Sequence, residues 1–150
     1  MNTINHALLE GKRVLIRVDF NLPLDEGLKI TDDSRMIAAL PTIKKIITNG
    51  GKAIIMSHLG RPKNSFENKF SLKNIVFHLS NLLQNTVMFS KDCIGPIARK
   101  NVENMNNGDV LVLENLRFYS EEKNGDHDFA KELAKLGDIY IYDAFGAAHR

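Results

Sequence analysis

Short apolar runs alternate with longer, helix-like segments along this chain. The apolar runs have the length and character of strands, and they cover 13–18, 53–57, 87–89, 110–113 and 139–142. Helical patterns lie between them, over about 32–49, 71–83, 96–106 and 127–136. Strands that alternate with helices of this length indicate βαβ units and a parallel sheet. The polar stretches at 62–69 and 120–128 are expected to be loops.

The first helix carries signals at both of its ends. Thr31 or Asp32 is the expected N-cap, and the pair Gly50-Gly51 is the expected stop. Pro41 lies inside the periodic segment, and because a proline removes one backbone hydrogen bond it predicts a bend there.

Four of the apolar runs lead directly into loops with anion-binding or hydrogen-bonding side chains. The loops begin with Asp19-Phe20-Asn21, with His58, with Glu114 and with Asp143. In an open α/β sheet, ligands bind outside the carboxyl ends of parallel strands. The four loops therefore predict one site built from distant segments. Positive groups predominate in these loops, so the expected ligand is small and anionic.

Arginine is concentrated near these strand ends. Arg61, Arg117 and Arg150 follow strands, and Arg35 opens a helix. A guanidinium group binds phosphate or carboxylate through two N–H groups at once, whereas an ammonium group is a hydrated point charge. The alternative for any single arginine is a surface salt bridge, but the four together favour recognition of an anion.

Arg35 is unusual because a cation near a helix N-terminus opposes the helix dipole. An anion shared by Arg35 and the free N–H groups of that helix would explain its position. A side-chain pair between Arg35 and Asp32 would explain it equally well, and the sequence leaves both interpretations open.

Two shorter patterns add candidates for the same site. His58 and Arg61 flank Gly60 in a turn that presents two donors, whereas a histidine alone in a loop is more often incidental. Asp19 and Asn21 share one face of an extended segment and could receive hydroxyl groups and donate to a carboxylate. The alternative is an Asx turn after the strand.

Composition excludes several classes of protein. With 150 residues, 43% hydrophobic and 25% charged, the chain has the profile of a globular domain, and its net charge of +2 does not suggest a nucleic-acid binder. The single cysteine, the lack of an apolar leader and the lack of a membrane-length run predict a cytoplasmic protein. There is no nucleotide-binding glycine fingerprint, metal-ligand cluster or nucleophile triad, and His78 is expected to pack within its helix.

The chain resembles the phosphoglycerate kinase family, specifically its N-terminal domain. The resemblance spans nearly the whole chain and is carried, in the family's order, by 17–23 (RVDFNLP), 31–35 (TDDSR), 39–43 (ALPTI), 57–62 (SHLGRP), 113–118 (LENLRF), 143–146 (DAFG) and 148–150 (AHR). It implies a three-layer α/β/α, Rossmann-like domain that binds the phosphoglycerate. Because the chain stops in a loop just after a strand, we expect a truncated N-terminal domain without the nucleotide-binding C-terminal domain.

The resemblance also implies a reaction and its participants. The acyl phosphate of 1,3-bisphosphoglycerate passes to Mg-ADP, which gives 3-phosphoglycerate and Mg-ATP, in glycolysis and in its reverse. The nucleotide would bind to the missing domain, so no cofactor or metal is expected in this chain, which should be inactive alone. The full-length enzyme is expected to be a monomer without nucleic-acid or membrane partners.

The family's site residues transfer to matching positions here. Asp19 and Asn21 would contact the hydroxyl and carboxyl end of the glycerate, and Arg35 would be the catalytic arginine that stabilises the phosphoryl group in transfer. The basic patch that holds the non-transferring phosphate would consist of His58, Arg61, Arg117 and Arg150. The complete substrate set would be Asp19, Phe20, Asn21, Arg35, His58, Leu59, Gly60, Arg61, Arg117 and Arg150.

Two other functions remain as alternatives. One is a non-catalytic α/β module that binds a phosphorylated acid. The other is a Rossmann-type dehydrogenase domain, which the missing glycine fingerprint disfavours.

Overall fold

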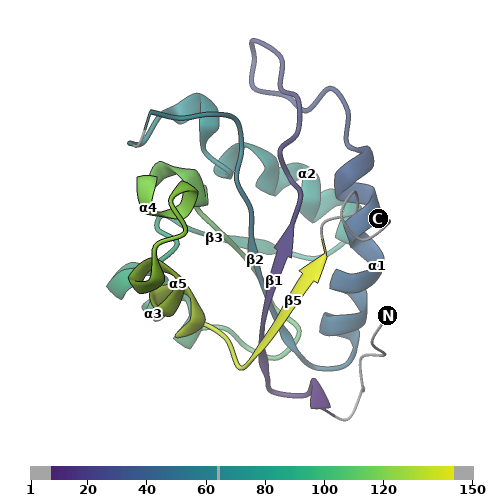
Figure 1. Cartoon of the computed structure of the whole chain (residues 1–150). Coiled ribbons are helices and arrows are strands. Elements are labelled where there is room, and N and C mark those ends of the chain that lie inside the picture. The colour runs from purple at the N-terminus through teal and green to yellow at the C-terminus, as the bar shows by residue number, and fades with distance from the viewer. Residues whose placement is uncertain (1–7, 64, 144–150) are drawn as a thin grey trace.

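A parallel five-stranded sheet forms the centre of the computed structural model, which describes residues 8–63 and 65–143 (Figure 1). Its strands run in the order β3-β4-β2-β1-β5. All four neighbouring pairs are parallel. Their bounds are β1 (Arg13–Val18), β2 (Lys52–Met56), β3 (Val87–Ser90), β4 (Val110–Leu113) and β5 (Ile139–Asp143). The carboxyl ends of all five strands therefore lie at one edge of the sheet.

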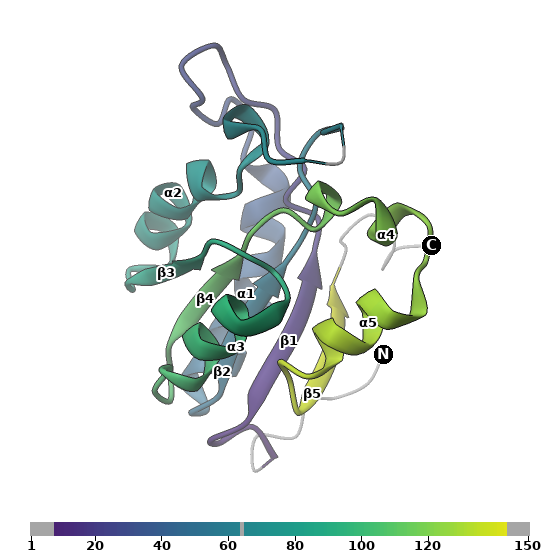
Figure 2. The same ribbon diagram turned by 90° about the vertical axis from the view of Figure 1, so that its left-hand side faces the viewer.

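Helices cover both faces of the sheet, as Figures 1 and 2 show. The helices α1 (Ser34–Thr48) and α2 (Lys73–Leu83) pack on one face, and α3 (Gly95–Glu103) and α5 (His127–Ala134) pack on the other. The pleat of β1 explains this arrangement, because Val14, Ile16 and Val18 face α1 and α2 while Leu15 faces the opposite layer. The predicted three-layer α/β/α fold is confirmed. No helix in the described part of the chain is long and apolar enough to cross a membrane.

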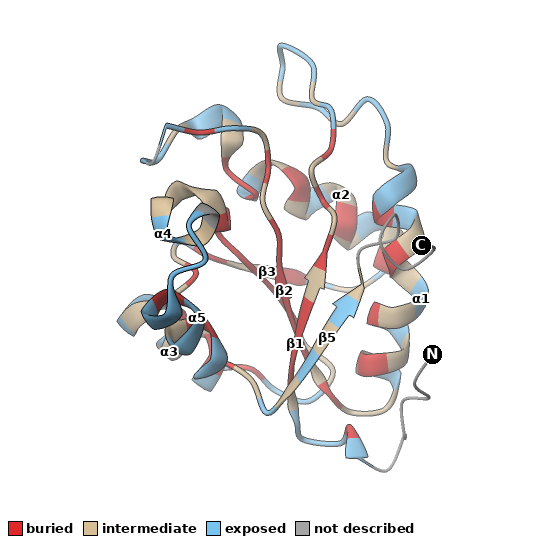
Figure 3. Cartoon of the chain, viewed as in Figure 1, coloured by how far each residue is buried: buried red, intermediate tan, exposed pale blue. Residues whose placement is uncertain are grey.

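Burial is greatest in the middle of the sheet and least at its β5 edge (Figure 3). All four residues of β4 are buried, as are the last four of β2. In β5, by contrast, Tyr140 and Tyr142 are 58% and 56% exposed. Each fully buried Ile, Leu or Phe contributes about 1.5–3 kcal/mol through the hydrophobic effect. The two apolar layers therefore provide a rigid support for the loops at the carboxyl edge.

The start of α1 differs from the prediction. The helix begins at Ser34, its N-cap is Asp33, and the Asp33 side chain makes no capping hydrogen bond. Instead, Asp32 Oδ1 accepts the Ser34 N–H at 2.9 Å, which makes an Asx turn just before the helix. The prediction of Thr31 or Asp32 as N-cap was therefore wrong by one or two residues. Pro41 lies within α1, as expected.

Three short helical turns lie in segments that were predicted to be loops. They are α4 (Ser120–Lys123) and two 3₁₀ turns, η2 (Asn68–Phe70) and η3 (Leu116–Phe118). A helix of three or four residues completes no periodic apolar pattern, so hydrophobic spacing cannot reveal it. The α4 turn matters because it places Glu122 next to the candidate site.

Candidate functional site

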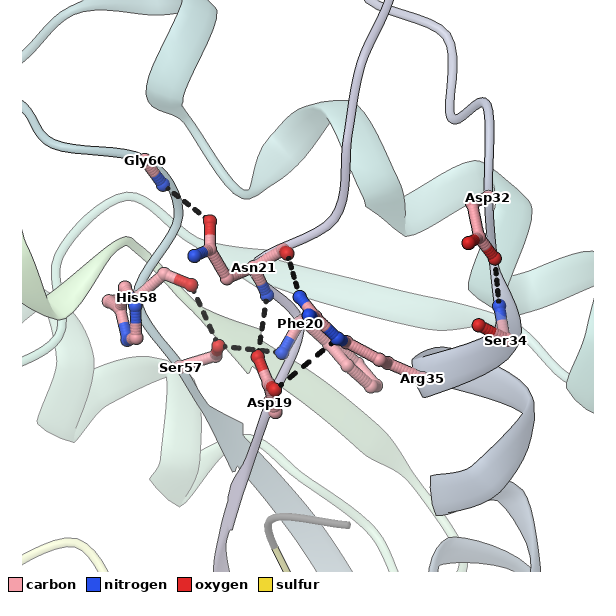
Figure 4. A network of polar contacts seen from close by, with 9 residues as sticks. All are labelled: Asp19, Phe20, Asn21, Asp32, Ser34, Arg35, Ser57, His58 and Gly60. Atoms are coloured by element: carbon pink, nitrogen blue, oxygen red, sulfur yellow. Dashed lines mark hydrogen bonds and ion pairs between the residues drawn. The ribbon is translucent and has the colours of Figure 1, made fainter. Parts of the chain in front are cut away.

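The loops after β1, β2 and β4 meet at the carboxyl edge of the sheet. Because β2 pairs with both β1 and β4, the segments 19–21, 58–62 and 114–118 lie next to one another. Figure 4 shows the first two of these loops meeting, with Arg35 reaching toward them from the start of α1. The predicted convergence is confirmed for three loops. Arg150, from the fourth loop, lies outside the described residues.

The loop after β1 is anchored through Phe20, whose side chain is fully buried. Its N–H donates to Ser57 Oγ at 3.0 Å, and that hydroxyl donates to the His58 carbonyl at 2.9 Å. On either side of Phe20, Asp19 and Asn21 are half-buried. The Asn21 N–H donates to Asp19 Oδ1 at 3.2 Å. The Asx turn considered from the sequence is therefore present, and both polar side chains still reach the site.

Asn21 joins the loops after β1 and β2. Its Oδ1 accepts the Gly60 N–H at 2.8 Å. Gly60 has a φ of +63°, and a Cβ at this position would overlap the ring of Phe70. Only glycine satisfies both conditions without strain, because it tolerates a positive φ and lacks a Cβ. Leu59 is 3% exposed and its carbonyl accepts from Asn115 Nδ2, so neither its side chain nor this carbonyl is free to contact a ligand.

Arg35 reaches back from α1 to the loop after β1. Its Nη1 donates to the Asn21 carbonyl at 2.7 Å, and its Nε lies 3.5 Å from Asp19 Oδ2. The ion pair with Asp19, rather than with Asp32, accounts for a cation in the first helical turn. The side chain remains 51% exposed and lines a cavity of about 470 Å³ together with Asn21, Leu22, Pro23, Asp32 and Ser34.

His58 and Arg61 occupy different environments in the loop after β2. His58 is half-buried, and its pKa is lowered, first by burial and then by the positive charges of Arg117 and Arg17. The imidazole is therefore neutral at pH 7. Arg61 is exposed, and it forms no hydrogen bond or ion pair with any other residue that the structure describes.

Arg117 is paired with an acid that sequence reasoning missed. Its Nε donates to Glu122 Oε1 at 2.9 Å, and Glu122 Oε2 accepts from Arg17 Nη1 at 3.0 Å. Burial opposes ionisation of Glu122, but the hydrogen bonds and charges of the two arginines outweigh it and lower its pKa. Glu122 is therefore a carboxylate at neutral pH, and it bridges two guanidinium groups.

Two buried polar residues fix the positions of the loops. Asn115 is fully buried, and its Nδ2 donates to the Leu59 and Phe70 carbonyls at 2.7 and 2.9 Å. Its Oδ1 accepts the Arg117 N–H at 2.9 Å, which starts the turn that carries Arg117. Glu114 accepts three hydrogen bonds, from Ser71 Oγ, Leu72 N and Asn115 N. Asn115 thus ties together the segments that contain Leu59, Phe70 and Arg117.

His78 corrects a further expectation. It was expected to pack within its helix, but its Nε2 lies 2.7 Å from Asp33 Oδ2 in the structure. The contact joins α2 to the start of α1, beside Arg35. A polar partner on another element is invisible to a periodicity argument, because such an argument places a side chain only on a face of its own helix.

Sequence reasoning also missed Ser57, Asn115, Arg17 and Glu122. Only Arg17 left a signal, as a charge inside the otherwise apolar stretch 14–18. The others are polar residues of kinds that are common at a protein surface, and their importance depends on which segments surround them.

Comparison with known proteins gives one consistent family. A family model described as phosphoglycerate kinase matches residues 4–150. The phosphoglycerate kinases of Chlorobium limicola and Chlorobium chlorochromatii are 55% and 54% identical over 148 residues, and that of Synechococcus is 52% identical over 147. These alignments cover 98–99% of this chain but only 37% of each relative. The chain therefore spans about 37% of the length of the relatives it matches.

Solved structures agree with the sequence relatives. The structure of phosphoglycerate kinase from Coxiella burnetii superposes with a TM-score of 0.81 at 39% identity. The one from Pyrococcus horikoshii superposes with a TM-score of 0.82 at 35% identity. Each covers 95% of this chain, which in turn covers 35% and 36% of those chains.

Proposed function

Because this chain belongs to the phosphoglycerate kinase family, we propose that it supplies the phosphoglycerate-binding part of a phosphoglycerate kinase. In the proposed reaction, 1,3-bisphosphoglycerate gives its acyl phosphate to Mg-ADP, which yields 3-phosphoglycerate and Mg-ATP. The observation that carries this proposal is the meeting of the loops at 19–21, 58–61 and 117 with Arg35 at one edge of the sheet.

The two ends of the substrate would bind to different kinds of side chain. Asp19 and Asn21 offer a carboxylate and an amide to the glycerate hydroxyl and carboxyl groups, beside the 470 Å³ cavity at Arg35. The non-transferring phosphate would bind to Arg61, Arg117 and the neutral His58, which can donate one hydrogen bond. We assign Arg150 to the same phosphate on the family's pattern alone.

Arg35 is the residue that we propose to be catalytic. In the direction of ATP consumption the nucleophile is a carboxylate, which is already ionised at neutral pH, so no general base is needed. Catalysis of phosphoryl transfer then depends on positioning and on stabilising negative charge. An exposed guanidinium that is held by Asp19 and Asn21 suits this task, because it is oriented yet reachable.

Nucleotide binding is assigned to a part of the protein outside these residues. The sequence contains no glycine-rich phosphate loop. Among residues 8–63 and 65–143, no three His, Cys, Asp or Glu side chains are grouped as a metal site would require. We therefore propose that residues 1–150 are inactive as a kinase alone. We further propose that the complete enzyme is a cytoplasmic monomer.

Titration with 3-phosphoglycerate tests the binding proposal. Chemical shifts in ¹⁵N–¹H NMR spectra should change at 19–21, 58–61 and 117, and the changes should weaken at high salt because exposed charges are screened. Arg61→Met should weaken binding. The matched control Lys63→Met, which removes another exposed charge from the same loop, should not. Shifts that appear only with NAD would support the dehydrogenase alternative and overturn the proposal.

The catalytic assignment needs the full-length enzyme. Arg35→Ala is expected to lower kcat more than it raises KM for 3-phosphoglycerate, because the lost interaction forms mainly in the transition state. Lys44→Ala, an exposed position on the same helix, is the control and should leave both constants unchanged. A normal kcat in the Arg35→Ala enzyme would exclude a catalytic role.

A further inference from the structure

Glu122 divides its carboxylate between two arginines from different parts of the chain. Oε2 bonds Arg17 in β1, 105 residues away in sequence, and Oε1 bonds Arg117 in the turn after β4. The Glu122 side chain is only 13% exposed, and the side chains of Arg17 and Arg117 are 23% and 30% exposed. A charge this shielded from water depends on its partners. The bridge is therefore a built feature of the site rather than a chance surface contact.

The way in which Arg117 is held leaves its phosphate-binding groups available. A carboxylate and a guanidinium usually pair through two parallel hydrogen bonds. Here Glu122 takes only the Nε of Arg117, and neither Nη group of Arg117 bonds another described residue. Two Nη groups are enough for a two-point contact with a phosphate.

We propose that Arg17 is a positioning residue that holds Glu122 by one oxygen, so that Glu122 orients Arg117 without competing with the substrate phosphate for it. This inference rests on the proposed function, in which Arg117 binds the non-transferring phosphate. Arg17 itself points to the α5 face of the sheet, where its neighbour Leu15 also packs, and it acts on the ligand through Glu122.

Loss of Arg17 would change what Glu122 does. With Oε2 unpaired, the nearest cation for this shielded carboxylate is Arg117. Glu122 would then bond a second N–H of Arg117 and occupy the group that the phosphate needs. The competing explanation is that Arg17 is only an additional positive charge near the ligand, with no role for Glu122.

A double-mutant cycle separates these explanations, because coupling between two residues appears as non-additivity. Binding of inorganic phosphate and of 3-phosphoglycerate is measured by NMR for the unmodified chain, Arg17→Met, Glu122→Gln and the double variant. Arg17→Met should weaken binding about tenfold, equivalent to about 1.4 kcal/mol. In the Glu122→Gln background the same change should cost less than about twofold. An equal loss in both backgrounds would show that Arg17 acts by charge alone, and it would overturn the proposal.

A control variant tests whether the effect is specific to Arg17. Arg13 is also a β1 arginine paired with an acid, Asp138, but it lies at the other end of the strand. Phosphate binding should therefore be unchanged in Arg13→Met. If Arg17→Met fails to fold, the double variant compared with Glu122→Gln still decides the question, because it leaves no unpaired carboxylate at position 122.

The spectrum without ligand tests the contact independently of the proposed function. In Arg17→Met, the Nη protons of Arg117 should become observable as slowly exchanging signals because Glu122 now bonds them, and in the unmodified chain they should not. Identical Arg117 signals in both chains would overturn the inference. If the unmodified chain binds neither ligand, the proposed function fails, and the ligand-free spectra still decide this inference.

Discussion

Replacing Asn115 with alanine removes the side chain that ties three segments of the site together. The variant loses two hydrogen bonds from Nδ2 and one to Oδ1. The residue is fully buried, so water cannot replace these contacts without opening the core. The carbonyls of Leu59 and Phe70 and the N–H of Arg117 each lose this partner.

The magnitude follows from the number and burial of these bonds. A typical hydrogen bond contributes about 1 kcal/mol to stability, so three give about 3 kcal/mol before any further cost of leaving their partners buried. Domains of this kind are stable by about 5–15 kcal/mol, so the variant should fold but with a large loss of stability. With a urea m-value of about 2 kcal/mol/M, the midpoint should fall by about 1.5 M.

The assay is urea unfolding followed by far-ultraviolet circular dichroism, with tyrosine fluorescence as a second probe. Asn49→Ala is the matched control, because it deletes the same side chain at the half-buried end of α1, where Nδ2 makes one bond to the Lys45 carbonyl at 2.7 Å. The control should lose no more than about 1 kcal/mol. If Asn115→Ala were no less stable than Asn49→Ala, the role given to Asn115 would be refuted.

Three other measurements test separate parts of the structure. Asp138 has its pKa lowered from 3.8 to about 2, chiefly by hydrogen bonds from Arg13, so its stabilisation is present above pH 4 and disappears as the pH falls toward 2. The stability difference between the native chain and Asp138→Asn, measured by thermal unfolding, should shrink over that range, and a constant difference would contradict the assignment. His58 should titrate by NMR below pH 6.5, because burial and neighbouring arginine charges disfavour its cation, and inorganic phosphate should raise that pKa. An unchanged value would place the phosphate elsewhere. Gly60→Ala should cost more than about 1 kcal/mol in urea unfolding, because it combines a positive φ with a clash against Phe70; an equally stable variant would show that the loop can rearrange.

The meeting of the loops after β1, β2 and β4 at one edge was predictable, whereas the order of the strands was not. Apolar runs followed by polar loops predict parallel strands whose carboxyl ends share an edge, and this prediction needs no knowledge of which strand lies next to which. The insertion of β4 between β2 and β3 leaves no trace in the hydrophobic pattern. In β5, exposed tyrosines alternate with less exposed isoleucines, but all four side chains are apolar, so the sequence pattern does not mark this strand as an edge either.

The partner of Arg35 shows why local reasoning failed inside the site. From the sequence, Asp32 was the candidate ion-pair partner because it lies three residues before Arg35. In the structure, Arg35 pairs with Asp19 instead. The choice depends on the path of the chain between β1 and α1, which returns the helix start to the strand end. Asp32 instead accepts the Ser34 N–H through Oδ1. Which of two nearby carboxylates an arginine contacts cannot be read from spacing along the chain.

Arg17 differs from the other arginines near the site because it lies within a strand. The pleat of β1 places it one residue before the strand's end, on the face opposite Val18. A guanidinium on that face needs an acid from the layer above it, and the short helix α4 supplies Glu122. A charged residue near the carboxyl end of an otherwise apolar strand therefore predicts a counter-ion in a loop across that end. Where that loop also carries a cation that is proposed to bind a ligand, as Arg117 is here, the pair is a candidate for positioning that cation.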